Sequence, residues 1–368
     1  MKIGIDARLI HETGVGRYVR NLIAQLGKTD QTNTYVVFLR KAAYQSFTPP
    51  NVHWQKRLAD VQWHSVTEQL FMPAIYWQEH LDLLHVPYFN VPLFYFGKFV
   101  VTIHDLTILH FDTGKASTLP YVLYKLKRIG YHLELMKALF WAEKIIAVSE
   151  VTKKEITDHF DIFPGNIEVT HEGIDKELFT QSSPKREIKE PYFLYVGNAY
   201  PHKNLEILIE SFASLITDYR LPITPRLVLV GKDDFFYRRL RETEKVKRLG
   251  DRIVFKTVVS DSVLSVLYHF AQASVFPSLM EGFGLPPLEA LSLGCPVIAS
   301  DIPVFHELLG AAPIYFDPHD TRVLTNHLKS ALGVLRTKSF TQKARAVVSK
   351  YSWQKMARET LSVYESSL

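Results

Sequence analysis

Two glutamates bracket the segment of the chain with the clearest chemical pattern. Glu281 and Glu289 flank the loop Gly282-Phe283-Gly284-Leu285-Pro286-Pro287. An ionised carboxylate accepts several hydrogen bonds and so suits a ligand rich in hydroxyl groups, and the N–H groups of a glycine loop can face a phosphate. One glutamate at a helix start would merely complement the helix dipole. Two glutamates with this loop between them fit that explanation poorly, so we predict a binding site.

A lysine after a predicted strand is a second residue suited to an anionic ligand. The run Tyr192–Val196 predicts a strand, and Gly197 and Asn198 then lead to Lys203 at the start of a predicted helix. A cation there opposes the helix dipole, because the first backbone N–H groups already carry partial positive charge. A diphosphate between the lysine and the helix would relieve that conflict. The alternative is a solvated surface lysine.

Two glycines near the beginning of the chain could also approach a phosphate. Gly14 and Gly16 follow a predicted strand that ends at Asp6, and they open a predicted helix. Glycine lets backbone N–H groups come close to a ligand, and a helix N-terminus favours an anion. A tight strand–helix turn without a ligand is the alternative. The full G-x-G-x-x-G pattern is absent, which argues against a nicotinamide or flavin cofactor.

His104 comes directly after the predicted strand Phe99–Ile103. Ligands of open α/β sheets bind at the carboxyl ends of the strands, so this histidine is a candidate site residue. A lone histidine in such a place is more often a hydrogen-bonded structural residue, but the neighbouring motifs favour a functional one. The other histidines considered show no ligand spacing, and we therefore expect no metal site; they are His64, His80, His85, His110 and His171.

Short apolar runs alternate with longer helical patterns, which predicts an α/β fold built from βα units with parallel sheets. Strands are expected at Lys2–Asp6, Tyr35–Leu39, Phe99–Ile103, Lys144–Val148, Ile167–Thr170, Tyr192–Val196, Arg226–Val230, Arg252–Phe255, Ala273–Phe276, Pro296–Ala299 and Ile314–Phe316. Helices are expected at Val15–Leu26, Leu119–Ala142, Val151–Phe160, Asn204–Ile216, Asp261–Ala271 and Leu285–Leu293, among others.

The alternation of strand and helix patterns, which begins again after a polar segment, also predicts two domains. We expect a first domain over residues 1–180, a linker over 181–191, a second domain over 192–350 and a final amphipathic helix over 351–368. The linker is polar, carries two prolines and has no apolar period. Ser352 is the expected N-cap of the final helix.

Composition narrows the class of protein. The 368 residues are 47% hydrophobic and 22% charged, which is ordinary for globular domains. A single cysteine, Cys295, excludes an internal disulfide and fits a reducing compartment. We expect no signal peptide and no membrane-spanning run, hence a cytoplasmic protein. The net charge of +5 is mild, and no basic stripe predicts nucleic-acid binding.

With these motifs together, the sequence resembles the GT-B glycosyltransferases of the large retaining family 4, and within it the mannosyltransferase-like branch. The resemblance spans nearly the whole chain and implies two Rossmann-like domains facing each other across a cleft, with the C-terminal helix crossing back to the first. The matching residues are Gly4–Arg8, Thr13–Tyr18, Glu68, Gln69, Pro73, Leu84–Tyr88, Thr102–Leu106, Ala147–Glu150, Val196, Gly197, Pro201–Asn204, Glu281–Glu289 and Tyr351–Trp353.

The resemblance also implies roles for individual residues. Lys203 would bind the donor diphosphate, with Gly14 and Gly16 lining it from the other domain and Asn198 standing where many members carry an arginine. Glu281 would contact the donor sugar, with the amides of the loop nearby, and Glu289 would hold the ribose. His104 would bind near the C6 hydroxyl of the sugar and the transferring centre. The full set of implied catalytic and donor-binding residues is His104, Lys203, Glu281, Gly14, Gly16, Asn198, Val259, Gly282, Phe283, Gly284, Leu285 and Glu289.

The expected activity is retaining transfer of a hexose, with mannose favoured, from a nucleotide-diphosphate sugar to a saccharide or lipid-linked saccharide acceptor in cell-surface polysaccharide synthesis. GDP-mannose is the favoured donor and a UDP-sugar the second choice, and no cofactor or metal is expected. Two alternatives stay open: a UDP-glucose-type or sucrose-synthase-like enzyme on the same fold, and a non-catalytic nucleotide-sugar binding protein.

The segment 121–141 mixes aromatic residues with Lys125, Lys127, Arg128 and Lys137. A basic amphipathic helix of this kind can lie on an anionic lipid surface, which would make the protein peripheral on the inner face of the membrane. A helix packed on its own domain with a solvated basic face is the alternative.

Overall fold

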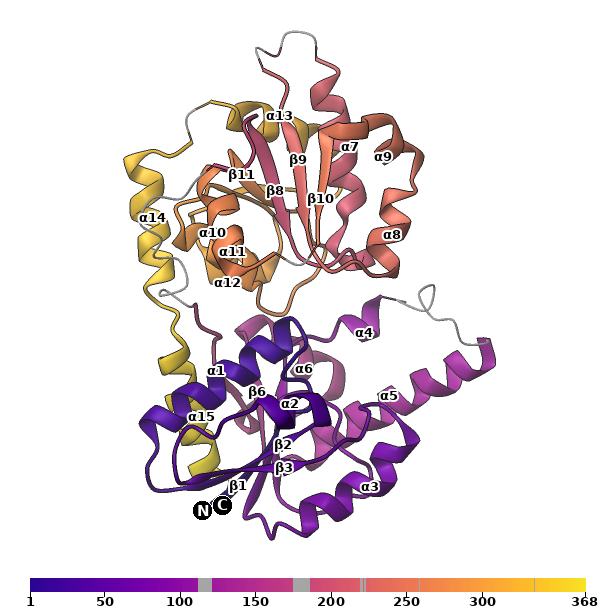
Figure 1. Ribbon diagram of the computed structural model, residues 1–368, viewed down its shortest axis with the longest axis vertical. Coiled ribbons are helices and arrows are strands. Elements are labelled where there is room, and N and C mark those ends of the chain that lie inside the picture. Colours follow the sequence, from indigo (N-terminus) through magenta and orange to yellow (C-terminus); the bar gives the residue numbers. More distant parts are fainter. Residues whose placement is uncertain (112–120, 175–185, 219–220, 222, 258, 334) are drawn as a thin grey trace. The chain divides into compact units, whose positions relative to one another are not determined.

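The chain divides into two compact units. The computed structural model describes residues 1–368 except 112–120, 175–185, 219–220, 222, 258 and 334 (Figure 1). Unit 1 comprises Met1–Leu106, Ser117–Gly173 and Ser352–Leu368, and unit 2 comprises Thr107–Ala116 and Ile174–Tyr351. Part of the expected linker, residues 181–185, lies outside the described residues; the remainder, 186–191, forms no helix or strand.

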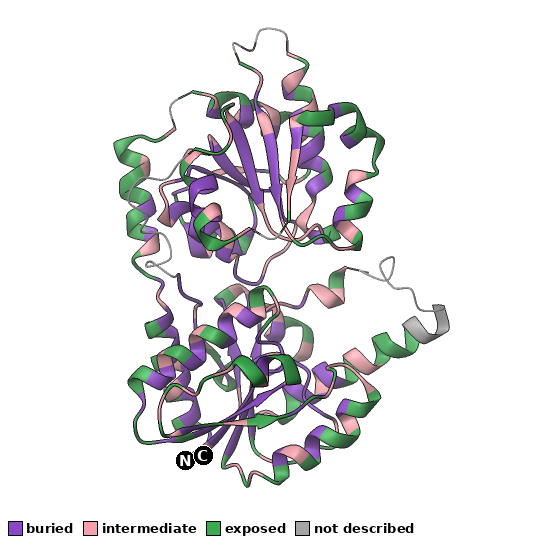
Figure 2. Ribbon diagram, in the orientation of Figure 1, coloured by how far each residue is buried: buried purple, intermediate pink, exposed green. Residues whose placement is uncertain are grey.

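Unit 1 is built on a seven-stranded parallel sheet in the order β3-β2-β1-β4-β5-β6-β7. Ile5 of β1 pairs with Val37 on one side and with His85 on the other. Because parallel sheets are covered on both faces, most of these strands are buried (Figure 2). The strands are β1 (Lys2–Asp6), β2 (Thr34–Leu39), β3 (Trp54–Leu58), β4 (Leu83–Val86), β5 (Phe99–Ile103), β6 (Lys144–Ala147) and β7 (Ile167–Val169).

Unit 2 repeats this plan with a six-stranded parallel sheet in the order β10-β9-β8-β11-β12-β13. Its core lies between the sheet and helices such as α7 (Leu205–Ile216), whose buried face includes Leu208 and Phe212. The strands are β8 (Tyr192–Val196), β9 (Arg226–Val230), β10 (Ile253–Lys256), β11 (Ala273–Phe276), β12 (Val297–Ser300) and β13 (Ile314–Phe316).

Helices connect the strands of both units. In unit 1 they are α1 (Gly14–Thr29), α2 (Lys41–Ser46), α3 (Val66–Trp77), α5 (Tyr121–Trp141), α6 (Glu150–Phe160) and α15 (Trp353–Ser366). In unit 2 they are α4 (Thr107–His110), α7 (Leu205–Ile216), α8 (Phe235–Arg241), α9 (Glu244–Leu249), α10 (Asp261–Phe270), α11 (Leu285–Ser292), α12 (Pro303–Leu309), α13 (Thr321–Ala331) and α14 (Lys338–Val348). Among the described residues, no helix is both long and apolar enough to cross a membrane.

The expected α/β architecture with parallel sheets is confirmed, but the strand prediction for unit 1 was incomplete. It omitted β3, an edge strand with the polar sequence Trp-Gln-Lys-Arg-Leu, and β4, which is four residues long and contains His85. Edge strands need no continuous apolar run, and a short strand with a buried histidine gives a weak signal. The first and last residues of several helices also differ by one to three positions from the expectation.

The final helix α15 belongs to unit 1, where it packs against α1. Its Tyr364 hydroxyl lies 2.6 Å from Nδ1 of His85, and Nε2 of His85 lies 2.8 Å from Oγ1 of Thr102. His85 and Tyr364 are fully buried. Burial lowers the pKa of His85 from 6.5 to about 3, so the folded state keeps this ring neutral.

This buried histidine predicts a loss of stability in mild acid. The unfolded chain binds a proton at His85 below about pH 6.5, while the folded chain does so only near pH 3. The free energy of unfolding should therefore fall with decreasing pH across this window, by up to about 1.4 kcal/mol per pH unit for this group. Urea unfolding between pH 7.5 and pH 5 should show a smaller acid slope in His85→Gln than in the wild type. The exposed control His319→Gln should keep the wild-type slope, and an unchanged slope in His85→Gln would contradict the assignment.

Candidate active site

Lys203 and Glu281 form an ion pair at the carboxyl edge of the unit 2 sheet. The ammonium group lies 2.7 Å from each carboxylate oxygen of Glu281, and both side chains are mostly buried, with exposed fractions of 16% and 14%. The Ser278 hydroxyl donates to Oε1 of Glu281 at 2.8 Å and orients the carboxylate further. The cation expected at this place therefore has an anionic partner within the protein.

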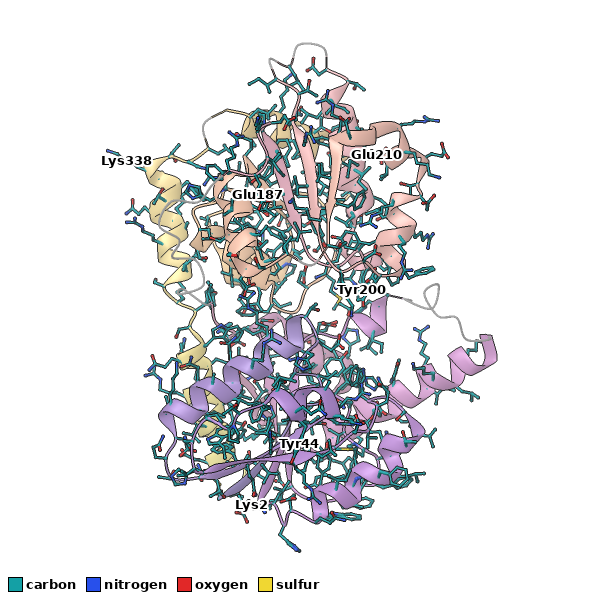
Figure 3. The ribbon with its side chains drawn as sticks, viewed as in Figure 1. Lys2, Tyr44, Glu187, Tyr200, Glu210 and Lys338 are labelled. Carbon is teal, nitrogen blue, oxygen red and sulfur yellow. The ribbon has the colours of Figure 1, made fainter. Side chains whose placement is uncertain are left out.

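The sheet explains why two residues 78 positions apart meet. β8 and β11 are adjacent parallel strands, so the loops after them leave the sheet side by side. Lys203 ends a short 3-10 turn, Pro201–Lys203, which follows Tyr200 (labelled in Figure 3), and Leu279 N–H donates to the carbonyl of His202 at 2.8 Å. That backbone hydrogen bond ties the two loops together and holds the ion pair in place.

The loop between the two glutamates turns sharply into α11. Gly284 is the N-cap with a φ of +94°, a conformation that residues other than glycine rarely adopt. A Cβ there would also lie 3.0 Å from the ring of Phe305. Phe283 and Leu285 are buried on either side of this turn, and Glu289, inside α11, is buried as well. The turn leaves Gly282 and Gly284 as the small residues beside Glu281.

Asn198 and Val259 were predicted from family positions rather than from chemistry. The backbone carbonyl of Asn198 accepts a hydrogen bond from the Tyr195 hydroxyl at 2.6 Å, and its side-chain oxygen accepts one from Tyr200 N–H at 3.3 Å. Asn198 thus shapes the turn after β8. Val259 is half-buried in the loop before α10, directly ahead of Ser260, the N-cap of that helix.

In unit 1, His104 is held by residues that follow three different strands. Its Nδ1 lies 3.0 Å from Oε1 of Glu172, its Nε2 donates to the Pro87 carbonyl at 3.2 Å, and the Tyr18 ring meets the imidazole edge-on at 5.0 Å. Glu172 was not predicted, although the rule that selected His104 also applies to it, since it follows β7 closely and is buried. These contacts fix the plane of the imidazole.

The two predicted glycines of α1 differ in their surroundings. A Cβ on Gly16 would lie 2.7 Å from the carbonyl oxygen of Ile10 and 2.8 Å from that of Leu9, so the packing of the helix start requires glycine there. A Cβ on Gly14 would meet no heavy atom within 4 Å. Gly16 is therefore explained by the tight turn, whereas Gly14 leaves room for a ligand to approach.

A buried cluster of charged residues lies at the carboxyl end of β1 in the unit 1 sheet. Nη2 of Arg8 lies 2.6 Å from Oδ2 of Asp6 and 2.6 Å from Oε1 of Glu68, and Asn90 also donates to Glu68 at 2.9 Å. Desolvation raises the pKa of Glu68, and the charge of Arg8 opposes that shift. A buried charge is tolerated only when it is paired and hydrogen-bonded, as here. The cluster fixes the loop after β1 against α3.

Some histidines that looked scattered in the sequence have close carboxylate neighbours. His64, Glu68 and Glu134 place potential metal-ligand atoms within 4.8 Å of one another, and Nδ1 of His64 lies 2.5 Å from Oε2 of Glu134. Glu134 also accepts from Gln69 at 2.7 Å, so hydrogen bonds within unit 1 account for its carboxylate.

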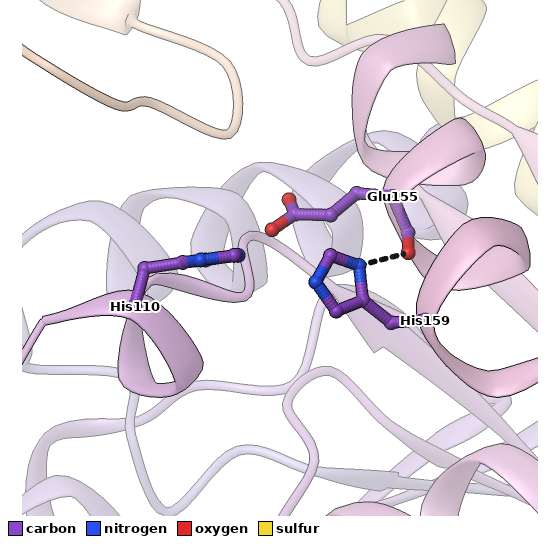
Figure 4. A group of neighbouring side chains, drawn as sticks. All are labelled: His110, Glu155 and His159. Carbon is purple, nitrogen blue, oxygen red and sulfur yellow. Dashed lines mark hydrogen bonds between the residues drawn. The ribbon is translucent and has the colours of Figure 1, made fainter.

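Helix α6 carries a further histidine. His159 donates from Nδ1 to the backbone carbonyl of Glu155 at 3.1 Å, one turn earlier (Figure 4). His110, drawn in the same figure, ends α4 and belongs to unit 2. The hydrogen bond is local to the helix and orients the His159 ring along it.

Comparison with known proteins assigns both units. Residues 13–178 match the family described as Glycosyltransferase Family 4, and residues 175–346 match the family described as Glycosyl transferases group 1. The chain is 27% identical over 297 residues to the O-antigen chain mannosyltransferase RfbU of Salmonella typhimurium, a match that covers 80% of this chain and 78% of that protein.

Solved structures show the fold. Sucrose-phosphate synthase from Thermosynechococcus elongatus superposes with a TM-score of 0.76 at 20% identity, over 99% of this chain and 98% of that one. Anabaena Alr3699/HepE in complex with UDP-glucose gives a TM-score of 0.73 at 19% identity, over 99% and 100% of the two chains. The expected GT-B fold is confirmed by these similarities. Since the two family matches together leave only the ends of the chain unmatched, the protein belongs to the family 4 (group 1) glycosyltransferases with the GT-B fold.

Proposed function

We propose that this glycosyltransferase transfers a hexose, with mannose favoured, with retention of anomeric configuration, from a nucleotide-diphosphate sugar to a saccharide or lipid-linked saccharide acceptor. The Lys203–Glu281 pair carries the proposal, because it joins a diphosphate-binding cation to a hydroxyl-binding carboxylate at one sheet edge. The Salmonella relative is named an O-antigen chain mannosyltransferase, which supports mannose as the transferred sugar. GDP-mannose as the donor and a cell-surface polysaccharide as the product are part of the same proposal.

In the proposed mechanism the donor replaces the ion pair on both sides. The diphosphate forms an ion pair with the ammonium group of Lys203, and the sugar hydroxyls donate hydrogen bonds to the carboxylate of Glu281. Charge that develops on the leaving diphosphate is then stabilised electrostatically by Lys203 and by backbone N–H groups of the Gly282–Leu285 turn. The leaving phosphate accepts the proton of the acceptor hydroxyl, so the reaction needs no separate base, metal or cofactor.

The other predicted residues complete the proposed donor site. Glu289 would hold the ribose and Val259 would lie beside the base, while Asn198 shapes the turn that carries Lys203. From unit 1, Gly14 would border the diphosphate, with Gly16 fixing the turn behind it. His104, oriented by Glu172 and Pro87, would contact the donor sugar near the transferring centre.

A second candidate donor is UDP-glucose. The solved structures with similar folds include a sucrose-phosphate synthase and a protein bound to UDP-glucose. At their low sequence identity to this chain, the similarity supports a shared fold and not a shared donor. A non-catalytic nucleotide-sugar binding protein is the remaining alternative. An assay of donor consumption in the presence of a lipid extract distinguishes these alternatives, because either enzyme would consume the donor and a binding protein would not.

We further propose that unit 1 contacts an anionic membrane from the cytoplasmic side through one apolar surface, here called the docking face. Its exposed side chains come from α3, from the loop before β5 and from α5: Val66, Leu70, Phe71, Phe94, Phe96, Leu126, Ile129, Leu133, Phe140 and Trp141. Gln69 joins the three segments, because it donates to Glu134 of α5 and accepts from the backbone N–H of Leu93, both at 2.7 Å.

The charges around the docking face fit an anionic lipid surface. α5 carries exposed Lys125, Lys127 and Arg128, and its one acidic residue, Glu134, is buried. Lys137 lies 3.7 Å over the Trp141 ring, where burial lowers its pKa. Apolar side chains edged by lysine and arginine are typical of helices that lie in a membrane interface.

Lys203→Ala tests the donor site directly. A ligand that binds only the folded state stabilises it by about 2.7 kcal/mol at a hundredfold excess over the dissociation constant. We expect GDP and GDP-mannose to raise the melting temperature of the wild type, or UDP and UDP-glucose to do so if UDP-glucose is the donor. The Lys203→Ala variant should lose this thermal shift. The surface control Lys245→Ala should respond like the wild type. No shift with any nucleotide would contradict the proposed function.

Glu281→Gln should separate nucleotide binding from transfer. Removing the carboxylate frees Lys203 from its internal partner, so the affinity for the nucleoside diphosphate alone should rise roughly fivefold. Transfer should fall by at least about tenfold, because the hydrogen bonds from the sugar hydroxyls to a charged group are lost. Calorimetric titration and a donor-consumption assay measure the two effects, with Glu187→Gln as a surface control. Weaker diphosphate binding in Glu281→Gln would show that the pair does not compete with the ligand.

The docking face predicts selective vesicle binding. Cosedimentation should be strong with phosphatidylglycerol vesicles and weak with phosphatidylcholine vesicles, since each lysine or arginine near an anionic surface contributes about 1 kcal/mol. The double variant Leu133→Glu, Phe140→Glu should bind the anionic vesicles at least about tenfold more weakly. Val52→Glu, at a residue 94% exposed outside this face, should bind normally. No binding of the wild type to either vesicle would rule out the membrane contact.

A further inference from the structure

A cavity of about 470 Å³ opens at the carboxyl ends of β1, β2 and β3 in unit 1. It lies beside α2, on which Tyr44 is labelled in Figure 3. Its volume falls within the roughly 300–1,000 Å³ of small-ligand sites, and open α/β sheets bind ligands at this edge. None of the site residues predicted from the sequence lines it; the lining residues used below are Arg8, His11, Glu12, Arg40, Asp60 and Trp63, together with Lys41.

The walls of this cavity are fixed by contacts between segments that follow different strands. Nη1 of Arg40 donates to Oε1 of Gln62 at 2.9 Å, and the Arg40 guanidinium lies 5.3 Å from the centre of the Trp63 ring. Oδ1 of Asp60 accepts from Lys41 N–H at 3.2 Å and lies 3.5 Å from Nε of Arg40. The aromatic ring and the charged side chains are thus positioned by the protein itself.

Arg8 of the buried cluster described above also lines the cavity. Arg8 donates to the Val61 carbonyl at 3.4 Å, and its charge is matched inside the protein by Asp6 and Glu68. The wall therefore presents two cations, Arg40 and Lys41, and two carboxylates, Glu12 and Asp60, with the His11 ring beside them. Within the described residues, the side chains of His11, Glu12 and Lys41 have no hydrogen bond or ion pair.

We propose that this cavity is the subsite that binds a neutral saccharide as the acceptor. The inference rests on the proposed function and extends it to the acceptor's chemistry. A sugar presents an apolar face of C–H groups, which packs on an aromatic ring such as Trp63. Its hydroxyl groups both donate and accept, so they can use the carboxylates of Glu12 and Asp60 and the donors of Arg40 and Lys41 together.

The balance of charge favours a neutral sugar over a phosphorylated one. A phosphate would gain from Lys41 and Arg40, but it would lie close to the carboxylates of Asp60 and Glu12, and like charges in one cavity are unfavourable. The carboxylate of Asp60 already forms an ion pair with Arg40 and accepts a hydrogen bond from the backbone N–H of Lys41. The positive charge of Arg40 is therefore partly neutralised before a ligand binds. A neutral polyol meets no such conflict.

Ligand-observed saturation-transfer NMR on the full chain tests the proposal. The probes are methyl α-D-mannoside, N-acetyl-D-glucosamine and mannobiose, with mannose 6-phosphate as the charged comparison. We expect transfer to at least one neutral probe. The affinity for it should fall at least about tenfold in Trp63→Ala, a loss of about 1.4 kcal/mol or more, and less in Trp63→Phe, which keeps a ring. Trp77→Ala removes an exposed tryptophan outside the cavity and should bind like the wild type.

The outcomes are separable because nucleotide thermal shifts are recorded on the same samples. Nucleotide binding without any saccharide signal, or saccharide binding that survives in Trp63→Ala, would overturn the subsite and leave the donor site standing. Tighter binding of mannose 6-phosphate than of the neutral sugars would overturn the argument from charge. Saccharide binding without any nucleotide shift would support the cavity and count against the proposed function. An unchanged melting temperature for Trp63→Phe shows that the fold is intact.

Discussion

The structure depends on one geometric constraint: in a parallel sheet every strand ends at the same edge. Side chains far apart in the sequence therefore collect there whenever they directly follow a strand. In unit 2 this brings Lys203 after β8 to Glu281 after β11, within 2.7 Å. Two charged groups at such a distance, largely removed from water, must be paired or hold a ligand. The pair in this structure is the form that a charged, hydroxyl-rich donor would have to displace.

The same constraint organises unit 1, but with a different balance of structure and chemistry. Arg8, Asp6 and Glu68 neutralise one another in the interior and fix the loop after β1. Arg8 of this cluster also lines the cavity formed by Arg40 and Trp63. Glu172 and Pro87 orient His104 after β5. Polar groups at one end of the sheet thus divide into a buried set that sets backbone geometry and a more accessible set available to ligands.

The sequence allowed the fold to be predicted, because buried parallel strands leave local signals, whereas the roles proposed for the site residues remain predictions. All six strands of unit 2 were located to within a residue or two, whereas β3 and β4 lacked an apolar run. Lys203 and Glu281 were each predicted as site residues from the sequence, but their mutual contact was not, since pairing depends on which strands are neighbours in the sheet. Glu172 follows β7 and could have been selected by the rule that selected His104, but its contact with His104 depends on the strand order and could not be read from the sequence. The structural need for Gly16 became visible only from the carbonyl oxygens that surround it.

In the proposed function, this chain moves a sugar from a nucleotide donor with retention of the anomeric configuration. The most direct measurement is nucleoside diphosphate release from GDP-mannose and UDP-glucose with and without a lipid-linked saccharide extract, followed by proton NMR of the anomeric centre in the product. We expect acceptor-dependent consumption of one donor, with GDP-mannose favoured over UDP-glucose, and a product with the anomeric configuration of that donor. Release from neither donor, or an inverted product, would contradict it.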